Sequence, residues 1–524
     1  MNNILKYMLM STALLAFLNF PAVGQSYQVI SNRCLGGSGG EGGGSIVYCG
    51  NYEFMIGCFT TSGVSGTKTV PLCNPTNSGM WTFKTDTTYS DIWQMTIDGY
   101  GVEGLTEFSI NLNNRNLNFS CGSMSDSSCD KSENNKSFPN HPSDYWVGAC
   151  DSSGVILWEK TLGGISSDDY PIIFQSSASD YYVIGTSTSP VGGDKTVANY
   201  GMDDYWMVKL DSIGHIKWDK VYGGSLRELH LNDDRLSMVE TDNNALVFMG
   251  TTNSPADGNV SDTSRGTYDL WVVKIDTSGA IIWDKRFGGN GPEYANRIIN
   301  TPDKGFMLCG QTRSDQGFDV SESKKGLDDV WIVKIDSLGN KQFDKRYGGN
   351  NHSYGIDIAN APGGGYWVGG FTDSDSLFDV SQPGYGFWDY WLIRLDSLGT
   401  KIWDGRYGGS GYDHLNSIAV LPDSSVVLCG VGDDGTSPVK TDSGYGGGDM
   451  YLVRIKYVDN TSGIAQPKSI SSFQLYPNPA QDAFTLVSDA LKQREVTISI
   501  YNLPGELVYR EKVTPNTNSI RVPI

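Results

Sequence analysis

One segment, Asp269-Leu-Trp-Val-Val-Lys-Ile-Asp276, constrains the fold of this chain more than any other, because variants of it recur seven times. The Asp that opens the pattern recurs after 53, 60, 65, 60, 60 and 60 residues. A fixed period of this kind indicates a repeat architecture, in which each unit packs on its neighbours. The third residue of each copy is aromatic: Trp93, Trp146, Trp206, Trp271, Trp331, Trp391 and Tyr451.

One period contains four short segments with the alternating or uniformly apolar pattern of β-strands. In the fourth copy they cover 269–276, 281–287, 295–299 and 305–310. Asp276-Thr-Ser-Gly279 predicts a hairpin turn, because Asp can bond its own backbone and Gly tolerates positive φ. Seven such units predict an all-β, seven-bladed β-propeller with blades of about 60 residues. A linear solenoid is the alternative, but a solenoid needs atypical capping repeats.

The repeated aromatic residue has two interpretations. A large apolar side chain between neighbouring blades would stabilise the fold by roughly 1.5–3 kcal/mol through its burial. The same residue would be a binding aromatic only if it were exposed. We expect the first role and therefore treat these residues as structural.

The ends of the chain differ from the repeat. Residues 1–24 combine Lys6, an apolar stretch and small residues before Gln25, which predicts a signal peptide for export to the periplasm. We place the propeller at 25–459, a polar linker at 460–470 and a small β-sandwich at 471–524. No later stretch is long and apolar enough to predict a transmembrane segment in the mature protein.

Composition narrows the partners and the compartment. A formal net charge of −20 argues against nucleic acid as a partner, because phosphates require basic surface. Seven of the nine cysteines lie between Cys34 and Cys150, which predicts disulfides in an oxidising compartment without defining their pairing. Cys121, Cys309 and Cys429 each precede a strand-ending Gly and are expected to be buried thiols.

The C-terminal segment opens with Tyr476, Pro477, Asn478 and Pro479. With the signal peptide, this motif resembles the type A C-terminal sorting domain of the type IX secretion system in Bacteroidetes. The resemblance implies an immunoglobulin-like sandwich, handling by that secretion machinery, and secretion or attachment at the outer-membrane surface. Such domains usually continue through further strands, so 471–524 is expected to be either a fragment of such a domain or an incomplete signal. Residues 25–459 are similar to the secreted propeller repeats that accompany this domain.

Candidate chemistry is sparse. Asp194, Asn259, Asp319 and Asp379 follow equivalent glycines by nine residues, in oxygen-rich loops that suit Ca²⁺. The alternative is that each side chain caps its own turn. The sequence contains no G-x-S-x-G, H-E-x-x-H or P-loop motif, and we predict no other cofactor and no catalytic residue.

Two functional hypotheses remain. The first is a non-enzymatic binding or adhesion module that contacts an extracellular glycan or protein through loops at one end of the propeller axis. The second is an extracellular polysaccharide hydrolase or lyase with its site at the axis. Two or three acidic side chains converging at the channel mouth would favour the enzyme. A channel plugged by Trp and aliphatic side chains would contradict the enzyme.

Overall fold

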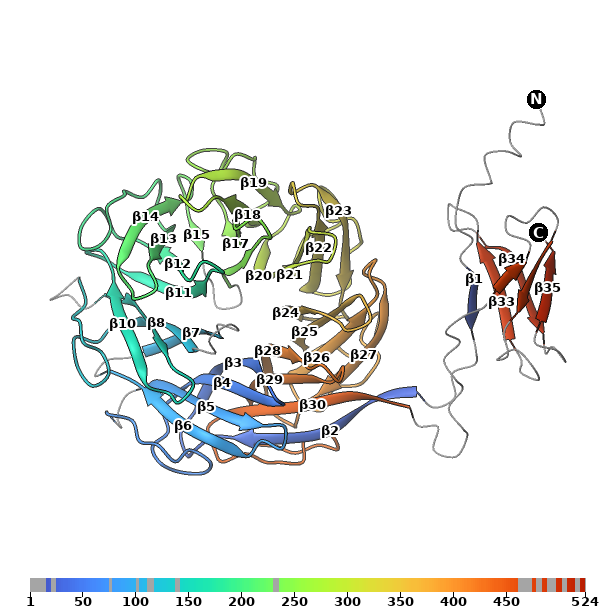
Figure 1. Cartoon of the computed structure of the whole chain (residues 1–524), viewed down its shortest axis with the longest axis horizontal. Helices are drawn as coiled ribbons and strands as arrows, with labels where there is room; N and C mark the ends of the chain where they lie inside the picture. The colour runs from blue at the N-terminus through green and yellow to red at the C-terminus, as the bar shows by residue number, and fades with distance from the viewer. Residues whose placement is uncertain are drawn as a thin grey trace. The chain divides into compact units, whose positions relative to one another are not determined.

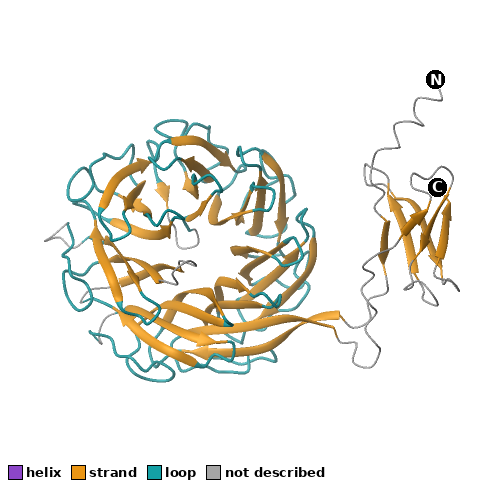
Figure 2. Ribbon diagram, in the orientation of Figure 1, coloured by secondary structure: helices purple, strands orange, loops and turns teal. Residues whose placement is uncertain are grey.

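The computed structural model describes residues 25–74, 78–99, 103–110, 117–136, 142–229 and 235–459, together with strand segments near both ends. The residues it describes form strands and loops and no helix (Figure 2). None of these residues therefore belongs to a helix able to cross a membrane. The chain divides into two compact units, Val29–Lys456 and a second unit made of Met1–Gln28 with Tyr457–Ile524.

The larger unit is a ring of seven antiparallel sheets around a central axis, which confirms the predicted seven-bladed propeller (Figure 1). Blade 1 contains β3 (Glu41–Gly50), β4 (Glu53–Thr60), β5 (Gly79–Asp86) and β6 (Asp91–Ile97). Blade 2 contains β7 (Glu103–Ile110), β8 (Leu117–Ser123), β9 (Asp144–Cys150) and β10 (Ile156–Leu162). Blade 3 contains β11 (Asp168–Gln175), β12 (Tyr181–Ser187), β13 (Asp204–Leu210) and β14 (Ile216–Tyr222). In blade 4, the first strand is divided into two pieces. Blade 4 contains β15 (Glu228–Leu229), β16 (Ser237–Glu240), β17 (Leu246–Thr252), β18 (Asp269–Ile275) and β19 (Ile281–Phe287).

Blades 5 and 6 keep the period most regularly. Blade 5 contains β20 (Glu293–Asn300), β21 (Phe306–Thr312), β22 (Asp329–Ile335) and β23 (Lys341–Tyr347). Blade 6 contains β24 (Ser353–Asn360), β25 (Tyr366–Thr372), β26 (Asp389–Leu395) and β27 (Lys401–Tyr407). The first strand of each blade lies nearest the axis and the fourth lies outermost (Figure 1). The sequence repeat therefore begins at the third strand of a blade, and its last two strands belong to the next blade.

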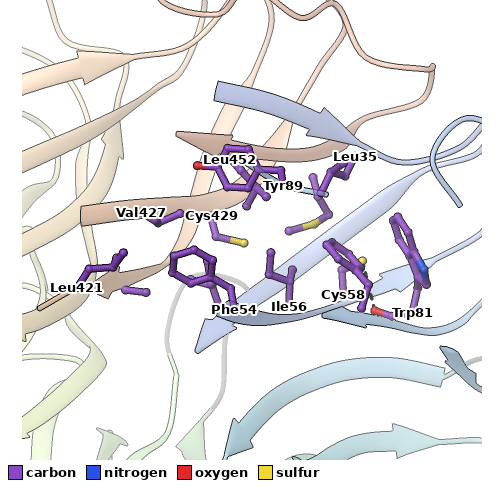
Figure 3. Close-up of a cluster of buried hydrophobic side chains, with 14 residues drawn as sticks. Leu35, Phe54, Ile56, Cys58, Trp81, Tyr89, Leu421, Val427, Cys429 and Leu452 are labelled. Carbon is purple, nitrogen blue, oxygen red and sulfur yellow. Dashed lines mark hydrogen bonds between the residues drawn. The ribbon is translucent and has the colours of Figure 1, made fainter. Parts of the chain in front are cut away.

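Blade 7 is assembled from both ends of the ring. It contains β28 (Asp413–Val420), β29 (Val426–Gly432), β30 (Asp449–Asp459) and, as its outermost strand, β2 (Gln25–Leu35). Complete sequence units alone do not close the circle, because β30 is followed by no fourth strand of its own. Figure 3 shows the apolar cluster at this closure, where Leu35 of β2 packs with Phe54 of β4 and Val427 of β29.

Each third strand carries a large, fully buried aromatic side chain, as predicted for a blade wedge. These residues are Trp81, Trp146, Trp206, Trp271, Trp331, Trp391 and Tyr451. In the first blade the structure thus places Trp81 at this position and not Trp93. Trp93 lies in the outer strand β6, where its indole N–H donates to the carbonyl of Ser152 at 3.0 Å. The difference arises because Gly79 replaces the usual Asp at the start of β5, so the Asp-x-Trp pattern falls on β6 instead.

Two hydrogen bonds to one carboxylate explain why the Trp recurs with an Asp in the following strand. The indole N–H of Trp271 donates to Asp284 Oδ2 at 3.0 Å. The same oxygen accepts the backbone N–H of Ser261, in the long loop between the second and third strands, at 2.9 Å. Trp331 and Asp344 repeat the 3.0 Å contact. The buried indole and a loop amide are thereby both satisfied, which fixes the loop against its blade.

The paired glycines of the repeat leave room for a buried carboxylate. A Cβ added to Gly288 would lie 1.8 Å from Oδ1 of Asp269, and one added to Gly348 would lie 1.9 Å from Oδ1 of Asp329. The predicted hairpin turn is also present, because Asp276 Oδ1 accepts the backbone N–H of Ser278 at 2.8 Å. Gly279 adopts a φ of +83° in that turn.

The cysteines divide into two groups. Cys73 and Cys129 form a disulfide between the long loops of blades 1 and 2. Cys121, Cys309 and Cys429 are buried thiols, as predicted. Among the described residues, Cys73–Cys129 is the one disulfide formed, and the other seven cysteines are buried thiols.

The smaller unit contains two three-stranded antiparallel sheets. They consist of β1 (Ala16–Asn19), β33 (Val496–Tyr501) and β34 (Leu507–Val513); and of β31 (Gln474–Tyr476), β32 (Ala483–Val487) and β35 (Ser519–Pro523). The strand β1 falls within the predicted signal peptide. The immunoglobulin-like sandwich stays a prediction.

Candidate binding surface

The loops that precede the first and third strands meet at one end of the propeller, which we call the loop face. Residues just before the third strand of one blade pair with residues just before the first strand of the next blade. These backbone bridges join Tyr268 to Pro292, Asp328 to His352 and Trp388 to Tyr412. Side chains at these positions therefore lie beside one another from blade to blade.

Seven ring-bearing side chains gather on the loop face of blades 6 and 7, and we call them the aromatic ledge. They are His352, Tyr354, Phe371, Phe387, Trp388, Tyr412 and His414. They come from β24, β25, β28 and the residues that precede β24, β26 and β28. The sequence offers no repeat signal for them, because they occupy positions that vary between copies of the pattern.

The ledge combines supporting rings with exposed rings. Phe371 and His414 stack at 4.5 Å between ring centroids, and Phe387 and Tyr412 stack at 5.0 Å. Trp388 lies 5.4 Å from Tyr354. Phe371 and Tyr354 are each 8% exposed, whereas Phe387 is 63% and Tyr412 is 46% exposed. Tyr412 lies 6.2 Å from His414, so the exposed pair is joined to the buried Phe371 through one histidine ring. Exposed aromatic rings anchored in this way suit an interaction surface.

Polar groups line one edge of the ledge. The His352 ring contacts Asp328, a buried carboxylate that also pairs with Arg313. The backbone N–H of His352 donates to Asp373 Oδ1 at 2.8 Å, and the Asn351 amide donates to Asp373 Oδ2 at 2.6 Å. Partial burial raises the pKa of Asp373 above its usual range. Donors and acceptors are therefore fixed beside the aromatic surface.

The axial channel contains a pocket of about 560 Å³. Its walls come mainly from the inner strands and combine aliphatic side chains, such as Ile172 and Ile418, with polar ones, such as Gln175. Among the described residues that line it, Asp357 is the one acidic side chain and Arg297 the one basic side chain. The convergence of two or three carboxylates that would favour a glycosidase is not found among these residues.

Buried acids occur instead at the junctions between blades. Glu228 and Glu293 are fully buried, and burial raises the pKa of Glu228 to about 8 and that of Glu293 to about 7. Glu228 accepts the backbone N–H of Gly224 at 3.1 Å, and Glu293 accepts that of Gly289 at 2.8 Å. Asp269, beside Glu293, is paired with Arg286 at 2.6 Å. Because these acids have no access to solvent, we assign them a structural role.

The four predicted calcium ligands lie at equivalent places in blades 3 to 6. Gly288 N–H donates to Asp319 Oδ2, and Gly348 N–H donates to Asp379 Oδ2, both at 3.1 Å. Asp194 accepts the N–H of Gly163 in the same way, and the backbone of Asn259 donates to the carbonyl of Gly223.

Each of the three carboxylates at these positions also meets a cation. Asp319 pairs with Arg265 at 2.9 Å, Asp379 with Lys325 at 2.6 Å and Asp194 with Lys136 at 3.6 Å. These contacts favour a loop-fixing role, because a calcium ion would compete with the lysine or arginine for the same oxygens. Calcium binding there stays a prediction. Of the predicted sorting motif, Tyr476 ends β31, and 477–479 lie outside the described residues.

Comparison with known proteins identifies the C-terminal segment. Residues 474–524 match the family described as a secretion system C-terminal sorting domain. The regulatory protein FlaEY of Caulobacter vibrioides is 23% identical over 299 residues, which cover 53% of this chain and 30% of that protein. The chain thus spans less than a third of the length of this relative.

Two solved structures are similar at lower identity. The Pan2 WD40 domain of Neurospora crassa is 10% identical with a TM-score of 0.43, covering 83% of this chain and 97% of that one. A polysaccharide lyase, the PL25 ulvan lyase, is 10% identical with a TM-score of 0.43, covering 80% and 96%. Likeness at this level carries no information about activity. With its seven blades and its matched tail, the protein is an exported β-propeller that bears a type IX secretion system C-terminal sorting domain.

Proposed function

We propose that this protein is an extracellular binding or adhesion module whose aromatic ledge contacts a glycan. The carrying observation is that Phe387 and Tyr412 expose stacked rings. Tyr412 also lies 6.2 Å from His414, which stacks on the buried Phe371. One face of a sugar ring presents C–H groups that pack on an aromatic face. Its hydroxyl groups both donate and accept hydrogen bonds, which suits the His352 and Asp373 edge.

The sorting domain supports this function because it implies secretion or attachment at the cell surface, where polymeric glycans are accessible. An enzymatic role has weaker support. Asp357 is the single carboxylate among the described residues of the axial pocket, and hydrolysis by retaining or inverting mechanisms uses two. The buried acids at the blade junctions have no access to a polymer.

A glycan-array screen of the full chain tests the proposal, followed by titration of the best ligand against three variants. We expect Phe387→Ala and Tyr412→Ala each to weaken binding at least about tenfold, which corresponds to about 1.4 kcal/mol. Tyr200→Ala removes an aromatic side chain that is equally exposed but lies off the ledge, and it should leave affinity within about twofold.

Unchanged affinity in both ledge variants would show that the ledge is not the site. An array without any bound glycan would contradict the glycan assignment and direct the search to protein partners. Shortening of a bound polymer during incubation would make the protein an enzyme.

A further inference from the structure

Two phenylalanines of the larger unit are exposed in a backbone conformation that disfavours them. Phe318 and Phe378 have φ of +49° and +53°, in the left-handed region where a bulky side chain is strained. They are 72% and 67% exposed, so burial does not offset this strain. Residues held in strained conformations cluster at ligand-binding sites and other functional positions.

Glycine occupies the equivalent position of the long loop in blades 1, 3 and 4. One backbone bond defines the equivalence, because Asp319, just after the first phenylalanine, donates its N–H to the carbonyl of Gly288 at 3.0 Å. Asn259, just after Gly258, donates in the same way to Gly223 at 2.8 Å. The loop thus forms with glycine at no steric cost, and its own conformation does not require a phenylalanine.

Each ring is presented by a fixed turn. In blade 5, Gly317 and Val320 exchange two backbone hydrogen bonds of 2.9 Å, and Val320 is buried. In blade 6, the N–H of the buried Val380 donates to the carbonyl of Leu377 at 3.1 Å. Because the turn is already ordered, a ligand that contacts the ring loses less conformational entropy on binding.

The carboxylates next to the two rings are neutralised by cations. Asp319 pairs with Arg265 at 2.9 Å, and Asp379 pairs with Lys325 at 2.6 Å. Each exposed ring therefore lies beside balanced charge, which complements an uncharged ligand better than a strongly charged one.

The loops that carry the rings begin and end at the aromatic ledge or at its polar edge. The loop of blade 6 starts at Asp373, which accepts the His352 N–H at 2.8 Å, and leads to Trp388 of the ledge. The loop of blade 5 starts at Arg313 and leads to Asp328, which contacts both Arg313 and the His352 ring. The two rings and the ledge thus belong to one part of the loop face, over blades 5 to 7.

We propose that Phe318 and Phe378 are further contact residues for the glycan at the ledge, and that this glycan is an uncharged polymer. The inference rests on the proposed function. Each ring packs on the C–H face of one sugar. A polymer that contacts the ledge and both loops gains affinity from every added contact, because the later contacts form within one complex. A trisaccharide contacts the ledge alone.

An array of neutral polysaccharides tests this inference, with cellulose, xylan, mannan and chitin each present as trisaccharide and as polymer. We expect the full chain to bind one polymer at least about tenfold more tightly than its trisaccharide. The double variant Phe318→Gly/Phe378→Gly should lose most of this preference and keep its trisaccharide affinity within about twofold. Leu398→Ala removes an equally exposed apolar side chain from the hairpin turn at the other end of blade 6, and it should bind as the wild type does.

Glycine suits the positive φ, so weaker binding by the double variant does not come from misfolding, and urea denaturation verifies this. Wild-type polymer preference in the double variant, or equal affinity of the wild type for polymer and trisaccharide, would overturn this inference and leave the ledge proposal intact. An array without any bound glycan would overturn both. Binding to phosphatidylcholine vesicles that the double variant loses, with an unchanged array, would assign the rings to a lipid surface instead.

Discussion

A left-handed backbone conformation recurs at one position of the long loop from blade to blade. Gly193 and Gly258 occupy it with φ of +59° and +55°, where glycine has no steric cost. Phe318 and Phe378 occupy the same position with φ of +49° and +53°, and they are 72% and 67% exposed. Bulky residues at positive φ are strained, so these two phenylalanines stabilise neither the loop nor the core.

Phe318→Gly should therefore stabilise the fold. Relief of the strained conformation, less the extra entropy of glycine in the unfolded chain, predicts a gain of about 0.5–1 kcal/mol in the free energy of unfolding. Gly258→Ala is the control, and it should destabilise the fold because it introduces a Cβ at the equivalent position of blade 4. Urea denaturation measures both. Destabilisation by Phe318→Gly would show that the ring contributes packing.

Gly348→Ala should be strongly destabilising for a different reason. The added Cβ would lie 1.9 Å from Oδ1 of the buried Asp329, so the carboxylate and its partner Arg346 must move. We expect a loss of about 2–3 kcal/mol, in the upper range for overpacking. Gly63→Ala meets no atom within 4 Å and should be nearly neutral. Equal stability of the two variants in urea would contradict this account of the paired glycines.

At the scale of elements, the contact between the two ends of the ring closes the propeller. β2 is the outermost strand of blade 7, and its residues Cys34 and Leu35 are buried. Without β2, β30 would become an exposed edge strand, and Leu35 would be missing from the cluster that joins blades 7 and 1 (Figure 3).

Deletion of residues 25–35 should thus lower the free energy of unfolding by at least about 3 kcal/mol, from lost burial alone. Deletion of residues 474–524, which belong to the other compact unit, is the matched control. We expect that control to leave the melting temperature of the propeller unchanged in calorimetry. A propeller that melts at the same temperature without β2 would show that three strands suffice for blade 7.

At the scale of the whole molecule, stability should depend on pH through the buried acids. The pKa of Glu228 is raised to about 8, that of Glu293 to about 7 and that of Asp144 to about 7, in each case mainly by burial. The folded state therefore binds more protons than the unfolded state between about pH 4.5 and 8. The contribution of these acids to the free energy of unfolding is fully present below this pH window and is lost as pH rises through it.

We expect the free energy of unfolding to fall by on the order of 2 kcal/mol or more from pH 5 to pH 8, since each pKa unit corresponds to about 1.4 kcal/mol. Urea denaturation at several pH values measures the slope. Glu293→Gln removes one titrating group while keeping its shape, and it should flatten the curve. Glu322→Gln, at a partly exposed side chain, should not flatten it. A slope of opposite sign would mean that these acids are ionised in the fold.

The sequence by itself determined the repeat and its consequences. The period, the Asp-x-x-Gly turn and the paired glycines are local features, and each predicts a strand or turn from residues within one unit. The sorting domain was identified in the same way from a short contiguous motif at Tyr476. Trp93 was assigned to the wrong strand because two strands of a blade carry similar patterns and only pairing distinguishes them.

The tertiary structure decided everything that depends on contact between distant residues. β2 joins a blade whose other strands lie about four hundred residues later, which no local pattern encodes. The aromatic ledge unites residues 352–414 across two blades, at positions that the repeat leaves free to vary. The ion pair of Arg297 with Asp357 and the hydrogen bond from Arg235 to the carbonyl of Asn416 exist because the ring brings inner strands to one axis. Local periodicity specifies blades, whereas ring closure specifies which variable side chains meet.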